Sequence, residues 1–249
     1  AMVNPVKIGG VETFSTVDFP DKIAAVVFMQ GCPWRCPFCH NAFLQDASAA
    51  DNFVWEKFVE FLKTRRGILD GVVFSGGEPL MQIGFVTELF EKAKKRGIHT
   101  CLDTSGITFN PGSQAVMAHF DRLLASTDLI LLDIKHIDPE EHVKLCSQPQ
   151  DNILAFAGYL EKKRIPVWIR HVVVPGITDR EEYLYRLGRY LGTLKNVKAL
   201  DVLPYHDMGK AKYHQLGIPY PLEDTAPLPP AKAAEARKII LQGMRDERT

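Results

Sequence analysis

The sequence has no excess of charge of either sign and no hydrophobic run that approaches the length of a membrane span. Thirty lysine and arginine residues balance thirty aspartate and glutamate residues over 249 positions. Without net charge there is no overall field that attracts nucleic acid or an anionic membrane, so we expect neither as a partner. An apolar signal core near the N-terminus is also missing, and we therefore expect a cytoplasmic protein.

The hydrophobic content, in contrast, is ample. At 46% of 249 residues it supports a substantial buried core. The chain is long enough for one α/β domain, and we predict a single domain over residues 1–249. Its core would span about 22–205, with a loop and helix extension over about 206–249.

Short apolar runs alternate with segments of helical periodicity along most of the chain. Six strands that alternate with helices imply a parallel sheet. Six strands are too few for a closed eight-stranded barrel. We therefore predict an α/β fold, a partial (β/α)6 barrel open on one side. Residues 8–22 predict a short strand and a loop. The six strands are expected at 23–29, 71–75, 98–103, 128–134, 166–174 and 197–203, and helices at 54–66, 82–96, 112–125, 139–163 with a break near 147–150, 180–194 and 231–244. A long loop is expected at 204–212 and an extended segment at 219–230.

Three of the five cysteines lie close together, in the stretch Cys32-Pro-Trp-Arg-Cys36-Pro-Phe-Cys39-His40-Asn41. Thiolates are the usual ligands of iron–sulfur clusters, and a cluster with four irons needs four ligands. Three protein ligands leave one iron open to a molecule from outside. That arrangement suits an enzyme whose cluster contacts its substrate.

Other uses of these cysteines stay open on the residues alone. A structural zinc ion in a non-catalytic binding module would need a fourth ligand, for which His40, Cys101 and Cys146 are the candidates. A ferredoxin-type cluster would need a fourth cysteine at a set spacing, which is missing. Because few other thiols remain, we expect a single cluster, and we expect Cys101 and Cys146 to be small buried or half-buried side chains.

Most of the unusual polar residues follow directly after a predicted strand. Because parallel strands end at one edge of a sheet, these residues are predicted to converge on one face. Taken singly, Asp103 has the alternative of a helix N-cap and Asp133 that of a salt bridge with Lys135. The residues are the cluster cysteines, Gly76-Gly77-Glu78, Asp103-Thr104, Asp133, Lys135, Arg170-His171 and His206.

The Cys-x3-Cys-x2-Cys spacing followed by His-Asn resembles the radical S-adenosyl-L-methionine (SAM) superfamily. The resemblance implies one 4Fe-4S cluster on Cys32, Cys36 and Cys39, with its open iron chelated by the amino and carboxylate groups of SAM. It also implies one-electron reduction of the sulfonium to give methionine and a 5'-deoxyadenosyl radical. Gly76-Gly77-Glu78 is similar to the glycine-glycine-glutamate element of that superfamily, and Phe38 stands where an aromatic residue lies beside the adenine.

Within that superfamily, residues 97–106, 127–135, 167–176 and 203–210 resemble the activating enzymes of glycyl radical enzymes. This resemblance implies a site for SAM and a monovalent cation, sodium or potassium, and it implies no protein group as general base. The SAM contacts it implies are Phe38, Cys39, His40, Gly76, Gly77, Glu78, Thr104, Asp133, Lys135, Arg170 and His206, and the cation contacts are Asp103, Thr104, Asp133 and the backbone of Leu131.

The implied activity belongs to anaerobic metabolism: abstraction of a hydrogen atom from a backbone glycine of a partner enzyme. Pyruvate formate-lyase is the first candidate partner. Residues 9–22 and 55–78 look more like the activating proteins of anaerobic ribonucleotide reductase, which keeps that enzyme, another glycyl radical enzyme or a small-molecule substrate as alternatives. The resemblance further implies a flavodoxin or ferredoxin-type reductant.

Overall fold

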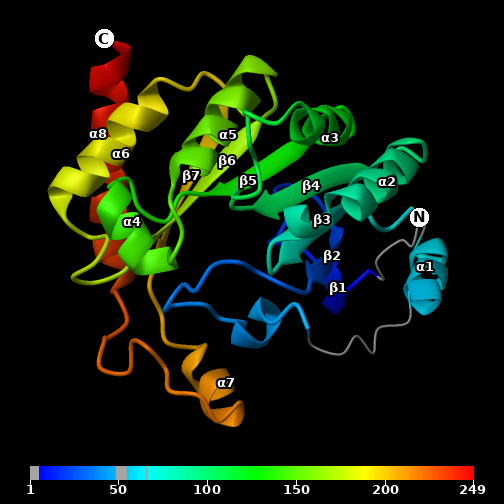
Figure 1. Cartoon of the computed structure of the whole chain (residues 1–249), viewed down its shortest axis with the longest axis horizontal. Coiled ribbons are helices and arrows are strands. Elements are labelled where there is room, and N and C mark those ends of the chain that lie inside the picture. The colour runs from blue at the N-terminus through cyan, green and yellow to red at the C-terminus, as the bar shows by residue number, and fades with distance from the viewer. Residues whose placement is uncertain (1–5, 49–54, 66) are drawn as a thin grey trace. The chain divides into compact units, whose positions relative to one another are not determined.

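The computed structural model describes residues 6–48, 55–65 and 67–249, and Figure 1 shows helices and strands alternating along the chain. Val54 and Arg66, the two ends of the helix predicted over 54–66, lie outside the described residues. Among the described residues, no helix combines the length and the apolar composition needed to cross a membrane. The confirmed alternation places the chain in the α/β class.

The described elements follow the predicted order closely. The strands are β1 (Ile8–Ser15), β2 (Ala24–Met29), β3 (Gly71–Gly76), β4 (His99–Thr104), β5 (Leu129–Asp133), β6 (Val167–Val173) and β7 (Val197–Pro204). The α-helices are α1 (Trp55–Thr64), α2 (Ile83–Lys94), α3 (Gln114–Leu124), α4 (Pro139–Cys146), α5 (Asp151–Lys162), α6 (Glu181–Gly192), α7 (Lys210–Gln215) and α8 (Pro230–Arg248). Two short 3-10 helices, η1 (Ala42–Gln45) and η2 (Pro79–Gln82), complete them.

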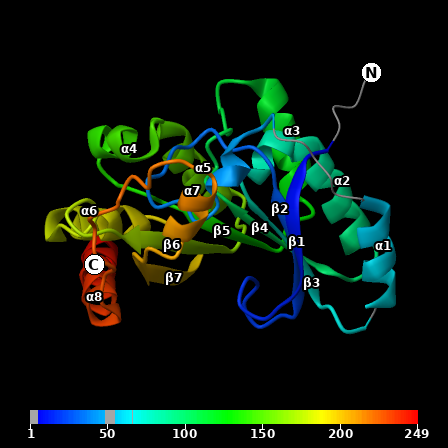
Figure 2. The same cartoon turned by 90° about the horizontal axis from the view of Figure 1, so that it is seen from below.

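The strands form one sheet in the order β1-β2-β3-β4-β5-β6-β7, so the described strands do not close into a barrel. β2, β3 and β4 are parallel, as are β6 and β7, which confirms the predicted open sheet. The short strand predicted within residues 8–22 is confirmed as β1, which precedes the six strands of the repeat. β1 adds an antiparallel edge beside β2, with Ile8 opposite Met29 (Figure 2).

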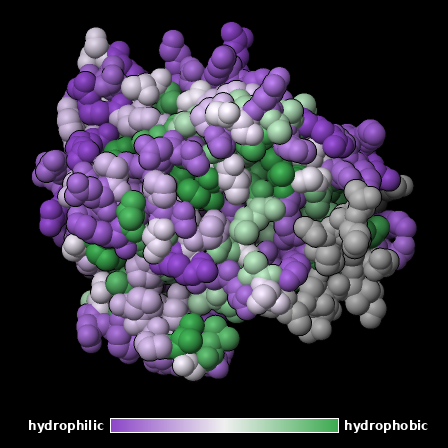
Figure 3. Space-filling view, in the orientation of Figure 1, coloured by the Kyte–Doolittle hydropathy of each residue, from purple (hydrophilic) through white to green (hydrophobic). Residues whose placement is uncertain are grey.

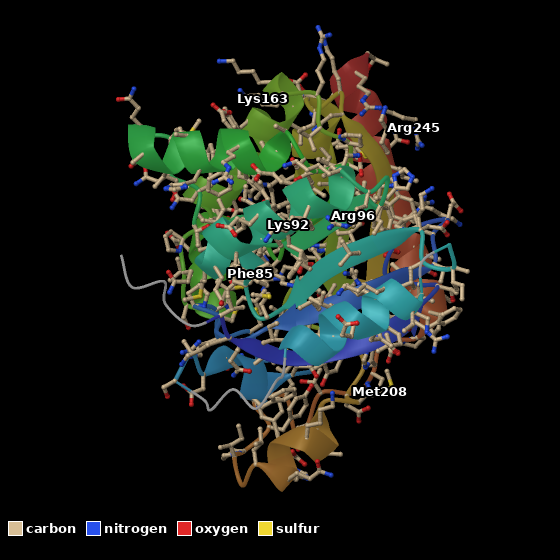
Figure 4. The ribbon with its side chains drawn as sticks, turned by 90° about the vertical axis from the view of Figure 1, so that its right-hand side faces the viewer. Phe85, Lys92, Arg96, Lys163, Met208 and Arg245 are labelled. Atoms are coloured by element: carbon tan, nitrogen blue, oxygen red, sulfur yellow. The ribbon has the colours of Figure 1, made fainter. Side chains whose placement is uncertain are left out.

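The chain divides into two compact units, described here separately. The first unit comprises Ala1–Cys32, Leu44–Thr104 and Asn110–Ile130. In it, β2 and β3 are apolar on both faces, as a strand covered on both sides requires. Phe74 of β3 packs edge-on against Phe85 and Phe90 of α2, with ring centroids 6.0 and 5.6 Å away. Lys92 of α2 and Arg96, which follows the helix, are exposed charges (Figure 4).

The second unit comprises Pro33–Phe43, Ser105–Phe109 and Leu131–Thr249. Its helix α4 begins at an N-cap, Asp138, whose carboxylate accepts hydrogen bonds from two backbone N–H groups of the first turn. Helices α6 and α8 pack so closely that a Cβ on Gly188 would lie 2.1 Å from the carbonyl oxygen of Ile240. Helix α8 extends beyond the predicted 231–244, because Pro230 suits the first helical position and the helix continues to Arg248.

Helix α7 is the main element that the sequence did not predict. The loop expected over 204–212 contains its first turn, and Gly209 immediately precedes it. Around α7 lie the apolar residues Met208, Leu216 and Ile218, which are 72%, 48% and 42% exposed. Figure 3 shows an apolar surface at the bottom, in the region that α7 occupies in Figure 1, and Met208 is labelled in Figure 4.

Candidate active site

The cysteine stretch begins in the first unit and continues in the second. In the first unit, the backbone N–H of Cys32 donates to Gln45 O at 3.3 Å. In the second unit, the N–H of Cys39 donates to Cys36 O at 3.1 Å, which closes a tight turn between two ligand candidates. All three thiols, like those of Cys101 and Cys146, are free of disulfides. Cys101 and Cys146 are fully buried, as predicted.

A buried ammonium group lies against this cysteine loop. Lys135 Nζ is 2.9 Å from Asp133 Oδ2, and the Lys135 side chain is only 12% exposed. The same Nζ lies 5.6 Å from the ring centroid of Trp34 and 5.5 Å from that of Phe38, within cation–π range. Burial opposes the charge, but the combined attraction of Asp133, Cys36 and Cys146 outweighs it and holds the pKa of Lys135 above its ordinary value. Asp133 therefore forms the salt bridge that the sequence offered as its alternative role.

The far end of the cysteine loop contacts the α7 segment. The rings of His40 and His206 lie 4.0 Å apart between centroids, and Lys212 Nζ donates to Asn41 Oδ1 at 2.6 Å. Ala42 packs in a small core with Tyr213 and Tyr220. Sequence reasoning missed these contacts because the segment was expected to be a loop.

His206 itself has an unsatisfied buried atom. Its Nδ1 is shielded from solvent and has no hydrogen-bond partner among the described residues. A buried nitrogen without a partner costs free energy, so it points to a polar group of a bound molecule. The role of His206 in binding SAM stays a prediction.

Helix α4 and the turn after it hold the near end of the loop. The Trp34 ring packs edge-on against the His142 ring at 5.6 Å, and Gln148 Nε2 donates to Pro33 O at 3.3 Å. The Cys36 thiol contacts the Cys146 thiol, with 3.8 Å between the sulfurs. That hydrogen bond, together with burial, raises the pKa of Cys36.

In the first unit, the glycine pair lies directly against the backbone that follows β2. Gly77 N donates to Met29 O at 2.9 Å, and Glu78 N donates to Gly31 O at 2.8 Å. Gly76 has a φ of +99°, in the region that favours glycine. A Cβ on Gly77 would lie 2.2 Å from Gly31 O, so only glycine permits this close approach.

The acidic residues of the first unit have structural partners. The carboxylate of Glu78 is buried and accepts from Thr104 Oγ1 at 2.5 Å, and it also accepts from the backbone N–H of Leu80 at 3.0 Å. Asp103 accepts from Ser75 Oγ at 2.7 Å. The helix N-cap considered for Asp103 is wrong, because the next helix, α3, begins at Gln114 and is capped by Ser113 instead.

The predicted residues form two groups, one in each unit. The first unit holds Cys32, Gly76, Gly77, Glu78, Asp103 and Thr104, and the second holds Phe38, Cys36, Cys39, His40, Asp133, Lys135 and His206. Leu131 lies buried in β5 and Arg170 half-buried in β6, where the carbonyl of Arg170 accepts from Ile134 N at 3.1 Å. That the two groups share one SAM molecule stays a prediction.

Side chains that could surround a single metal ion are not gathered anywhere in the part of the chain that the structure describes. A structural zinc ion requires four ligands around one point. The zinc alternative stays a hypothesis for metal analysis.

Comparison with known proteins gives a family and named relatives. Residues 26–188 match the radical SAM superfamily. The pyruvate formate-lyase-activating enzyme of Streptococcus mutans is 44% identical over 238 residues, covering 94% of this chain and 90% of the relative. That of Listeria monocytogenes is 44% identical over 241 residues, covering 94% and 95%.

Solved structures with the same fold are more distant in sequence. A domain of a pyruvate-formate lyase-activating enzyme from Bacteroides vulgatus matches with a TM-score of 0.56 and 21% identity, covering 70% of this chain and 94% of that one. Coproporphyrinogen III oxidase from Escherichia coli, a radical SAM enzyme, matches with a TM-score of 0.55 and 12% identity, covering 93% and 54%. At these identities the likeness supports the fold alone.

Proposed function

This chain belongs to the radical SAM superfamily, and we propose that it is the activase of a glycyl radical enzyme, with pyruvate formate-lyase as its first candidate partner. One observation carries the proposal: the activating enzyme of S. mutans is 44% identical to this chain over 94% of its length. Similarity that extends over both chains almost completely includes the segments outside the cysteine motif. This similarity therefore supports the proposed partner enzyme as well as the proposed cofactors.

The superfamily implies a 4Fe-4S cluster and SAM, and the residues present fit both groups. The thiols of Cys32, Cys36 and Cys39 are not tied up in disulfides, and His206 Nδ1 lacks a partner among the described residues. We assign the cluster to the three thiols. The SAM contacts are then Phe38, Cys39, His40, Gly76, Gly77, Glu78, Thr104, Asp133, Lys135, Arg170 and His206.

When bound, the cluster and SAM supply a one-electron reduction of the sulfonium and the radical that takes a hydrogen atom from a glycine of the partner. The protein residues bind and orient. Lys135 places a positive charge near the Cys36 thiol, which becomes a negative thiolate when it binds iron, and Phe38 offers an apolar face beside the same ammonium group. Glu78 and Thr104 fix the ends of β3 and β4 to each other.

A monovalent cation is part of the proposal, with Asp103, Thr104, Asp133 and the backbone of Leu131 as its contacts. Carboxylate and carbonyl oxygens are the ligands that such hard cations prefer. SAM binding measured by calorimetry in potassium, sodium and choline chloride at equal ionic strength tests it. Equal affinity in all three salts would remove the cation from the site.

The experiment that tests the function mixes the reconstituted, reduced protein and SAM with each candidate partner under anaerobic conditions. We expect the glycyl radical doublet in the electron paramagnetic resonance spectrum of pyruvate formate-lyase. Cys36→Ala should abolish it, and Cys101→Ala, which removes a buried thiol from β4, should leave it intact. A doublet on anaerobic ribonucleotide reductase alone would reassign the partner. Replacing flavodoxin by a ferredoxin or a chemical reductant in the same assay identifies the electron donor.

Iron and acid-labile sulfide analysis of the anaerobically purified protein separates the enzyme from a zinc-binding module. We expect about four irons and four sulfides per chain. One zinc without sulfide would contradict the assignment.

A further inference from the structure

A second buried thiol lies against one of the three cluster cysteines. Cys36 Sγ donates to Cys146 Sγ at 3.8 Å, although the two residues are 110 positions apart in the sequence. Cys146 is completely buried, and Cys36 is 8% exposed. Both belong to the second unit, and the cysteine motif does not account for Cys146.

Backbone contacts fix Cys146 in this position. Its carbonyl oxygen accepts from the N–H of Arg35, the neighbour of Cys36, at 3.1 Å. Helix α4 ends directly after it, because Ser147 adopts a left-handed conformation with a φ of +61° and its N–H donates to Val143 O at 2.8 Å. The thiol therefore has a fixed orientation toward Cys36, since the chain on either side of it is anchored.

We propose that Cys146 is a positioning residue that donates an S–H hydrogen bond to the Cys36 sulfur when that sulfur binds iron, and thereby raises the reduction potential of the cluster. The proposal rests on the proposed function, in which Cys36 is a ligand. The geometry that supports it is the 3.8 Å separation of the two sulfurs, which is within reach of an S–H hydrogen bond from Cys146 to Cys36.

The effect on the potential follows from charge. Reduction adds an electron to the cluster, and part of the added negative charge falls on the ligand sulfurs. A donor aimed at one of these sulfurs stabilises the reduced state more than the oxidised state, so its removal makes the cluster harder to reduce. The S–H group is a weak donor, but its acceptor is charged and the contact is shielded from water.

The test is a redox titration of the reconstituted protein without SAM, followed by electron paramagnetic resonance of the reduced cluster. Cys146→Ala and Cys146→Val both remove the donor, and the valine keeps the volume filled so that water does not enter. We expect the ratio of reduced to oxidised cluster at a fixed potential to fall about three- to tenfold, which is about 30 to 60 mV for one electron at 59 mV per tenfold. Cys146→Ser, which keeps a donor, should remain closer to the wild type.

Cys101→Ala is the matched control, because it also removes a fully buried thiol, and we expect the wild-type potential. The proposal is overturned if the donorless variants titrate like the wild type, or if Cys101→Ala shifts equally. It is also overturned if Cys146→Ala loses iron and sulfide, since Cys146 would then be a ligand. Failure of the proposed function is a separate result: the wild-type protein would hold no cluster, or its cluster would form no glycyl radical on a partner.

Discussion

The contact between Gly77 and the backbone after β2 leads to a quantitative prediction for Gly77→Ala. The added Cβ would lie 2.2 Å from Gly31 O, 2.8 Å from Gly31 C and 3.0 Å from Met29 O. All three are backbone atoms, so no side chain can rotate away. Overpacking commonly costs about 1–3 kcal/mol, and because the neighbours here are rigid we expect about 3 kcal/mol. For a chain of this size, such a loss lowers the melting temperature by about 6–12 °C.

The assay is urea unfolding followed by circular dichroism, with Gly84→Ala as the control. Gly84 lies in the first turn of α2, and nothing stands within 4 Å of the position of its Cβ. There alanine should stabilise the helix by up to about 1 kcal/mol. The two alanine substitutions are therefore predicted to act in opposite directions. If Gly77→Ala unfolds at the same urea concentration as the wild type, the close approach of the two backbones is not as described.

Three further predictions concern the second unit. Lys135→Met leaves the Asp133 carboxylate without its buried partner and should lower the free energy of unfolding by about 3 kcal/mol, measured by urea unfolding. Burial lowers the pKa of His171 to about 4. In the unfolded chain the imidazole of His171 binds a proton near pH 6.5, whereas in the folded chain it stays neutral until about pH 4. The free energy of unfolding should therefore fall by at most about 3 kcal/mol as the pH decreases from 6.5 to 4. His171→Asn should flatten that pH dependence. Lys212→Ala removes the hydrogen bond to Asn41, and we expect less than about 1 kcal/mol of lost stability but faster loss of iron in air, followed by cluster absorbance.

The spacing of apolar residues was sufficient to predict the sheet, because buried parallel strands are apolar throughout, whereas amphipathic helices repeat their apolar residues about every three to four positions. It did not give the bounds of β1, because glycines and exposed residues conceal the alternation of this edge strand, although a short strand was predicted within residues 8–22. Nor did it reveal α7, which has only six residues and begins within the expected loop. Short helices are stabilised by tertiary packing, here through Tyr213, more than by their own propensity.

The candidate site was predictable to the extent that its residues follow strands or share a motif. The Asp133–Lys135 pair is an example, since both residues lie within three positions at the end of β5. Contacts between distant segments were not predictable. Nothing local to Cys146 indicates that it lies 3.8 Å from Cys36, because a single sequence shows the period of each segment but not which segments meet.

These distant contacts bear on how the site binds its cofactor. Many small metal sites fold only when the metal binds, because their ligands are disordered without it. Here the part of the cysteine loop in the second unit has supports at both ends: Arg35 bonds to the end of α4, and Asn41 bonds to Lys212 of α7. Each contact orders the loop through protein atoms alone. Ordering the loop in advance removes conformational entropy that cluster binding would otherwise have to overcome, so the thiols of Cys36 and Cys39 are held for an incoming cluster by the fold itself.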